Sequence, residues 1–165
     1  MHYITRMPDS LRASRSKGVS ETVCAATALR KASRRLAQLY DQALVPCDLK
    51  STQYAILSQI ESLAARAPTM RELADELVMD RSTLGHNLRP LERDGLVETI
   101  AGVEDKRVKH IALTKAGQRR LREAKQRWQL AQNQFLSVFG EAAAIRLRNT
   151  LSDIAHDERL FSLVD

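Results

Sequence analysis

The sequence predicts a mainly α-helical protein with one short β-hairpin, and three observations support this. Apolar residues recur at spacings of three and four along most of the 165 residues, which is the period of an amphipathic helix. Glycine (6 residues) and proline (4 residues) are scarce, so long loops are not expected. Strand-like runs occur at Val97–Ala101 and 108–113, on either side of a polar segment that begins with Gly102.

The net charge of the chain, +6, favours an anionic partner. Basic side chains that neutralise phosphates gain free energy because they release counterions. Residues 1–20 carry several of the basic side chains and no apolar period, so we expect a flexible basic N-terminal arm. A solvated tail is the simpler interpretation of this arm, and contact with a DNA backbone is the alternative.

The sequence gives little support for a membrane protein, a metal site or an enzyme. No apolar run is long enough to cross a bilayer, and the beginning lacks the apolar core of a secretion signal, so we expect a cytoplasmic protein without membrane contact. Cys24 and Cys47 are too few for a disulfide framework and lack metal-ligand spacing. The 4 histidines are scattered, and no nucleophile with a partner base can be named. We therefore expect neither catalysis nor a metal or cofactor.

Helical periodicity and capping residues predict the first three helices. One long helix is expected over 20–44, ended by Pro46, and a second over about 52–64. Thr69 and Glu72 form a capping box, in which each side chain binds a free backbone amide, so a short third helix begins there.

The next helix completes a helix-turn-helix. Asp80 is a good N-cap, and Gly95 ends the helix in the left-handed conformation that glycine allows. Its buried stripe is formed by Leu84, Leu88 and Leu91. A hairpin directly after the second helix of such a pair is a wing, so residues 48–113 are predicted to form a winged helix-turn-helix.

The long helices at both ends of the chain predict a dimer. From Thr114, apolar residues alternate at spacings of three and four as far as Val138, and after Gly140 a last amphipathic helix extends to Phe161. A small protein has few partners to cover these stripes together with that of the first helix. We expect one domain over 21–165 that dimerises through the helices at 21–44 and 114–165. An intrachain core alone is the alternative.

Polar residues on the exposed side of the fourth helix are the candidate DNA contacts. The major groove accepts one α-helix, and base edges are reached from its first turns. Arginine donates twice to guanine, serine and threonine pair with either a base or a backbone oxygen, and threonine also offers a methyl group to thymine. The candidates are Arg81, Ser82, Thr83, His86, Asn87 and Arg89. For each of them a solvated polar face is the alternative.

The predicted wing carries a second group of candidates, Asp105, Lys106 and Arg107. Arg107 is the best residue for insertion into a minor groove, because a narrow groove concentrates negative potential around a guanidinium. Asp105 is expected to orient Arg107 by a charge-assisted hydrogen bond, and an ordinary turn aspartate is its alternative role.

These elements together resemble the MarR family of winged helix-turn-helix regulators. The matching segments are ELADEL, MDRSTL, LRPLERDGLV, the DKR of the wing and ALTKAG, with LRKASRRLAQLYDQAL and TQYAIL upstream. The resemblance runs from about Thr22 to the C-terminus. It implies a homodimer whose first and last helices form the interface. It also implies a pseudo-palindromic double-stranded DNA operator, bound by a repressor that a small phenolic or aromatic effector releases.

Three residues depart from an idealised member of this family. Val78 stands in the turn where glycine is frequent, and a β-branched residue resists positive φ. Gly85 lies inside the recognition helix, where it costs about 1 kcal/mol relative to alanine and either permits close approach to DNA or is simply tolerated. Pro90 disfavours helical geometry at Arg89, so we expect a kink there rather than a helix end.

The sequence says least about how the protein senses a signal. Cys24 is expected to be a buried, inert small hydrophobe, and Cys47 an exposed residue in a loop. Candidate effector-pocket residues are Ser33, Arg34, Tyr54 and Trp128. A cysteine-based redox sensor and a non-specific architectural nucleic-acid binder are the alternative functions. The sequence leaves open the operator, the effector and the choice between repression and activation.

Overall fold

The computed structural model describes residues 24–102 and 105–160. The N-terminal arm expected at 1–20, two residues of the wing tip and Phe161 lie outside the described residues. The chain divides into two compact units, Met1–Leu36 and Ala37–Asp165, and each is described by itself.

The first described helix, α2, spans Ala25–Leu44 and crosses from one unit to the other. A short 3-10 helix, Val45–Cys47, follows and contains Pro46. The expectation for the cysteines was wrong, because Cys24 is exposed and Cys47 is buried. Cys24 directly precedes the first residue of α2 and is exposed there, whereas Cys47 is 5% exposed within the hydrophobic core of the second unit.

Three short helices form the centre of the second unit: α3 (Ser51–Ser62), α4 (Met70–Glu76) and α5 (Arg81–Arg93). Their apolar faces meet in one core that the long helix α6 (Lys115–Phe139) also contacts. The largest buried side chains in this core are Leu44, Ile56, Leu57, Leu73, Leu84, Leu88, Leu91 and Leu121. The predicted stripe of α5 is therefore confirmed as buried.

Hydrogen bonds at the ends of these helices cap them as expected. The Thr69 hydroxyl accepts from the Glu72 amide at 3.2 Å, and the Glu72 carboxylate accepts from the Thr69 amide at 2.8 Å. After the last residue of α5, Arg93, the chain turns at Gly95, whose φ is +67°, with the Leu96 amide donating to the Leu91 carbonyl. The turn between α4 and α5 has the same geometry, and Val78 adopts a φ of +51° there despite its branched side chain.

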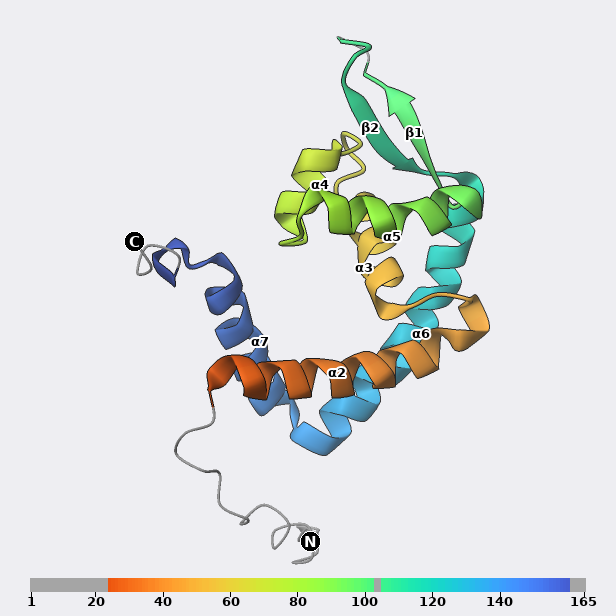
Figure 1. The fold of residues 1–165 in the computed structure, drawn as a ribbon. Coiled ribbons are helices and arrows are strands. Elements are labelled where there is room, and N and C mark those ends of the chain that lie inside the picture. Colours follow the sequence, from red (N-terminus) through yellow and green to blue (C-terminus); the bar gives the residue numbers. More distant parts are fainter. Residues whose placement is uncertain (1–23, 103–104, 161–165) are drawn as a thin grey trace, which may run out of the picture. The chain divides into compact units, whose positions relative to one another are not determined.

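The wing is an antiparallel hairpin of β1 (Val97–Ala101) and β2 (Lys109–Leu113). Figure 1 shows it extending beyond α4 and α5. Val97 pairs with Leu113 at the base and Ala101 with Lys109 toward the tip. Val97 and Ile111 are buried, so this part of the hairpin belongs to the hydrophobic core.

Helix α6 (Lys115–Phe139) and helix α7 (Glu141–His156) complete the second unit, separated by Gly140 as expected. The expectation that the last helix reaches Phe161 was wrong, because α7 ends at His156. Asp157 adopts an extended conformation and its carboxylate accepts from the amide and guanidinium of Arg159. Such local side-chain hydrogen bonds compete with helix continuation. A short 3-10 helix, Glu158–Leu160, follows.

Candidate nucleic-acid interface

The recognition helix α5 presents one polar face opposite its leucine stripe. Asp80 caps it by accepting from the Thr83 amide at 2.8 Å, so the first turn is held in helical geometry. All six side chains predicted to contact DNA from this helix line one surface hollow of about 580 Å³, together with Gly85. The structure therefore brings this group of sequence candidates together.

Three basic side chains on that face have no hydrogen-bonding partner among the described residues. Arg81, His86 and Arg89 make no hydrogen bond or ion pair with the residues that the structure describes, and all three are exposed. Arginine and histidine donors without internal partners are available to phosphates and base edges.

Two other candidates are bound to their own helix. The Thr83 hydroxyl donates to Asp80 Oδ2 at 2.6 Å, and Asn87 Nδ2 donates to the Thr83 carbonyl at 2.8 Å. The pKa of Asp80 falls to about 2, first because the Thr83 hydroxyl bonds its carboxylate and then because the Thr83 amide does. Asp80 is therefore ionised at neutral pH.

The wing places Arg107 in solvent with a defined orientation. Asp105 accepts from the Arg107 amide at 2.9 Å and from its guanidinium Nε and Nη2 at 3.1 Å each. The hydrogen-bonded Arg107 side chain lowers the pKa of Asp105. The expected charge-assisted bond is thus confirmed, and the Arg107 side chain is 92% exposed. Lys106, next to it, is exposed as well.

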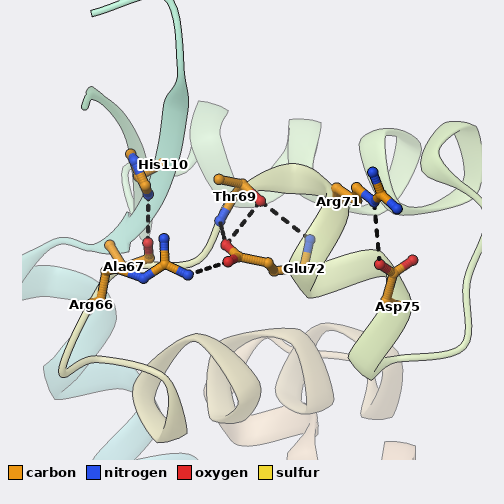
Figure 2. A network of polar contacts seen from close by, with 7 residues as sticks. All are labelled: Arg66, Ala67, Thr69, Arg71, Glu72, Asp75 and His110. Carbon is orange, nitrogen blue, oxygen red and sulfur yellow. Dashed lines mark hydrogen bonds and ion pairs between the residues drawn. The ribbon is translucent and has the colours of Figure 1, made fainter. Parts of the chain in front are cut away.

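A network missed by sequence reasoning ties the wing to the helix-turn-helix (Figure 2). In the loop before α4, the Ala67 carbonyl lies 2.6 Å from His110 Nδ1, and the Pro68 carbonyl accepts from the Ile111 amide at 2.8 Å. On the other side of this loop, Arg66 binds Glu72, which also caps α4 through Thr69. Ala67 and His110 are far apart in sequence and follow no periodic pattern, so only the structure reveals their contact.

The polar contacts of Glu72 affect its acidity. Hydrogen bonds from the Thr69 amide and hydroxyl, and then from Arg66, lower the pKa of Glu72 to about 2. The carboxylate is therefore fully ionised near neutral pH. Its negative charge lies at the N-terminus of α4, where it interacts favourably with the helix dipole.

The candidate effector residues fall in both units. Ser33 and Arg34 are exposed on α2 in the first unit. In the second unit, the ring of Trp128 stacks with Tyr40 at 5.4 Å and with Tyr54 at 5.7 Å between centroids. The Tyr40 hydroxyl also donates to Gln132 at 2.6 Å. Tyr54 and Trp128 thus belong to an aromatic stack that sequence reasoning did not foresee.

Comparisons with known proteins match this architecture. A model of the MarR family matches residues 48–108. The MosR transcriptional regulator of M. tuberculosis, solved in complex with DNA, is 35% identical with a TM-score of 0.74, and the match covers 85% of this chain and 99% of that one. The chain belongs to the MarR family.

Two further solved structures have similar coverage. A MarR-family regulator from Rhodococcus sp. RHA1 is 25% identical, with a TM-score of 0.71 over 86% of this chain and 99% of that one. CouR from Rhodococcus jostii RHA1, solved with p-coumaroyl-CoA, is 26% identical, with a TM-score of 0.72 over 86% and 97%. A comparison with curated protein sequences gave no significant match.

Membership of the MarR family makes this protein a DNA-binding transcriptional regulator rather than an enzyme. Its winged helix-turn-helix, expected from the sequence, is confirmed by these matches. Among the described residues, no helix is both long and apolar enough to span a membrane.

Proposed function

We propose that this MarR-family protein is a cytoplasmic repressor that binds a pseudo-palindromic operator as a homodimer and is released by a small aromatic or phenolic effector. Residues 21–165 act as one MarR-type domain in this proposal, with the winged helix-turn-helix at 48–113 and the dimerisation helices at 21–44 and 114–165. The basic arm at 1–20 precedes them. The observation that carries the proposal is the polar face of α5, whose basic side chains have no partners among the described residues.

In this proposal, sequence-specific binding arises because α5 and the wing contact different grooves of the operator. The α5 candidates Arg81, Ser82, Thr83, His86, Asn87 and Arg89 face the major groove in this proposal. Arg107, oriented by Asp105 and supported by Lys106, enters the adjacent minor groove. Operator-specific regulators lose about 1 to 3 kcal/mol per mismatched base pair, which a non-specific architectural protein does not.

A second copy of the chain is the partner that the exposed apolar residues of the last two helices require. Within the second unit, Val138 is 66% exposed, Phe139 48% and Ile154 47%. Leu130, Ile145 and Leu147 are also exposed. Large apolar side chains gathered at one end of a chain indicate an interface. A twofold dimer would also present two recognition helices to a twofold operator.

The effector proposal rests on the family and on one neighbour. CouR was solved with p-coumaroyl-CoA, an aromatic thioester. In this chain Tyr54 and Trp128, in the second unit, and Ser33 and Arg34, in the first, remain the candidate contacts. Thermal shifts with a panel of aromatic acids and their thioesters test this, because a ligand that favours the native state raises its apparent stability. No shift with any panel member would contradict this part of the proposal.

Footprinting tests the proposal as a whole. The full chain, incubated with the DNA around its own reading frame and excess non-specific competitor, should protect a twofold-symmetric segment, and sedimentation should give a dimer. Arg127, exposed on α6 and without an intramolecular partner among the described residues, provides the control: Arg127→Ala should leave the footprint unchanged. Monomers in sedimentation together with no protected segment would overturn the proposal.

The exposed thiol of Cys24 favours a redox-sensing regulator as the second candidate function. Backbone hydrogen bonds from Thr27 and then Ala26 lower the pKa of Cys24, which increases the reactive thiolate fraction. If oxidation regulates the protein, peroxide should release DNA from the wild type and from Cys47→Ser but not from Cys24→Ser. Equal release of all three would rule out Cys24 as the sensor.

A further inference from the structure

We propose that Asp80 sets the hydrogen-bonding polarity of Thr83, so that Thr83 meets a DNA base only as a hydrogen-bond acceptor and with its methyl group. Asp80 itself touches no base in this inference and is a positioning residue. The inference rests on the proposed role of α5 in the major groove and goes beyond it by naming the class of base that Thr83 recognises.

The two carboxylate oxygens of Asp80 have separate tasks. Oδ1 accepts from the Thr83 amide at 2.8 Å and thereby caps α5, while Oδ2 accepts from the Thr83 hydroxyl at 2.6 Å. A hydroxyl has one proton and two acceptor lone pairs. Once that proton is directed at Asp80, the part of Thr83 that faces solvent is acceptor only.

The carboxylate cannot reverse this arrangement at neutral pH. An ionised carboxylate has no proton to donate, and the hydrogen bonds of Thr83 and Ser82 hold the pKa of Asp80 at about 2. The Thr83 hydroxyl must therefore donate to Asp80 and never accept from it. Thr83 is exposed, so its free lone pair and methyl group are accessible to a ligand.

Base selection follows from the donors and acceptors of the major groove. Adenine N6 and cytosine N4 are the donors, thymine offers a methyl group, and guanine presents only acceptors. Thr83 should therefore favour adenine or cytosine through its hydroxyl oxygen, or thymine through its methyl group, and should discriminate against guanine at the position that it contacts in each half-site.

The variant Asp80→Asn tests the polarity directly. Asparagine is as good an N-cap as aspartate, so its carbonyl keeps the bond from the Thr83 amide. Its amide group now donates to the Thr83 oxygen, which frees the hydroxyl proton to donate outward. With every base pair sampled at each operator position, the preference at one position per half-site should shift about ten-fold toward guanine O6 or N7, or thymine O4.

Two substitutions of Thr83 keep the test decisive even where Asp80→Asn fails to fold. Thr83→Val retains the branched shape but no hydroxyl, so it should lose the adenine or cytosine preference at that same position. Adding Asp80→Asn to Thr83→Val should cause no further change in preference. Thr83→Ser should retain the hydroxyl preference and lose only a thymine preference.

Different experimental results would contradict this inference and the proposed function. An Asp80→Asn protein that binds specifically with the wild-type preference would overturn the inference. So would a Thr83→Val protein with a uniform loss across all sequences, since that result assigns Thr83 to a phosphate. A wild-type protein without any sequence preference would overturn the proposed operator binding instead.

Discussion

His110 Nδ1 in β2 lies 2.6 Å from the carbonyl oxygen of Ala67, in the loop that precedes α4 (Figure 2). The same loop supplies Thr69, the N-cap of α4. One short segment therefore holds both strand β2 of the wing, at the pair Ile100–His110, and the start of the helix-turn-helix. Together with the hydrogen bond from the Ile111 amide to the Pro68 carbonyl, this contact holds the wing beside α4.

Replacing His110 by leucine should loosen the wing without unfolding the protein. The variant keeps side-chain bulk but removes the bond to Ala67, so the free energy of unfolding should fall by about 0.5 to 1.5 kcal/mol in urea denaturation. Operator affinity should fall several-fold, because the wing must be ordered when DNA binds. His156→Leu is the control, since the His156 side chain bonds only to Ser152 of its own helix among the described residues. Unchanged stability and affinity in His110→Leu would show that the link has no mechanical role.

Replacing Arg107 by alanine should weaken DNA binding and leave stability unchanged. Its side chain is 92% exposed and, among the residues that the structure describes, pairs only with Asp105, so folding gains little from it. If the guanidinium enters a minor groove, titration with operator DNA should show a loss of about ten-fold or more, corresponding to about 1 to 3 kcal/mol. Thermal unfolding should match the wild type. Full affinity in this variant would count against a DNA-contacting wing.

Much of the fold was predictable because short-range chemistry decides it. The capping box of Thr69 and Glu72, the Asp80 cap and the left-handed Gly95 each depend on residues within one helical turn. The same holds for the Asp105–Arg107 bond. Such features are visible in a sequence because the partners are neighbours in it.

The wrong predictions concern structural features that depend on tertiary packing or on competing local hydrogen bonds. Nothing in the sequence shows whether Cys24 or Cys47 lies in the core, since burial depends on the elements around a residue. The end of α7 was placed too late because the apolar period hid the turn formed by Asp157. Val78 adopts a positive φ although the residue is 60% exposed, so two backbone hydrogen bonds of the turn, from the amides of Val78 and Met79, outweigh the preference of a branched residue.

Replacing Gly85 by alanine separates helix stability from DNA approach. A Cβ at Gly85 meets no atom of the described residues within 4 Å, so none of them requires glycine there. The variant should therefore be more stable, by about 1 kcal/mol in urea denaturation, because glycine is costly inside a helix. If the duplex approaches this position closely, operator affinity should fall at the same time. A more stable variant with full affinity would mean that Gly85 is simply tolerated.

Replacing Gly117 by alanine should have the opposite effect on stability. A Cβ at this position would lie 1.9 Å from the backbone oxygen of Leu96, where α6 packs against the segment before β1. The backbone has to shift to make room, so the free energy of unfolding should fall by about 1 to 3 kcal/mol. Gly85→Ala is the matched control for a methyl group added to a helix. Wild-type stability in Gly117→Ala would contradict this close approach.

Acid should selectively remove the contribution of Glu72 to stability. Its folded pKa of about 2 lies below its ordinary value of 4.5, so the stabilisation is fully present above about pH 4.5 and is lost as the pH falls toward 2. Glu72→Gln keeps the capping geometry without the charge. The wild type should therefore unfold at a higher temperature than this variant at pH 6, and the difference should close between pH 4.5 and pH 2. Glu98→Gln, which alters an exposed carboxylate on β1 without a partner among the described residues, should show no such convergence. A difference between wild type and Glu72→Gln that stays constant with pH would mean that the carboxylate gains nothing from its contacts with Thr69 and Arg66.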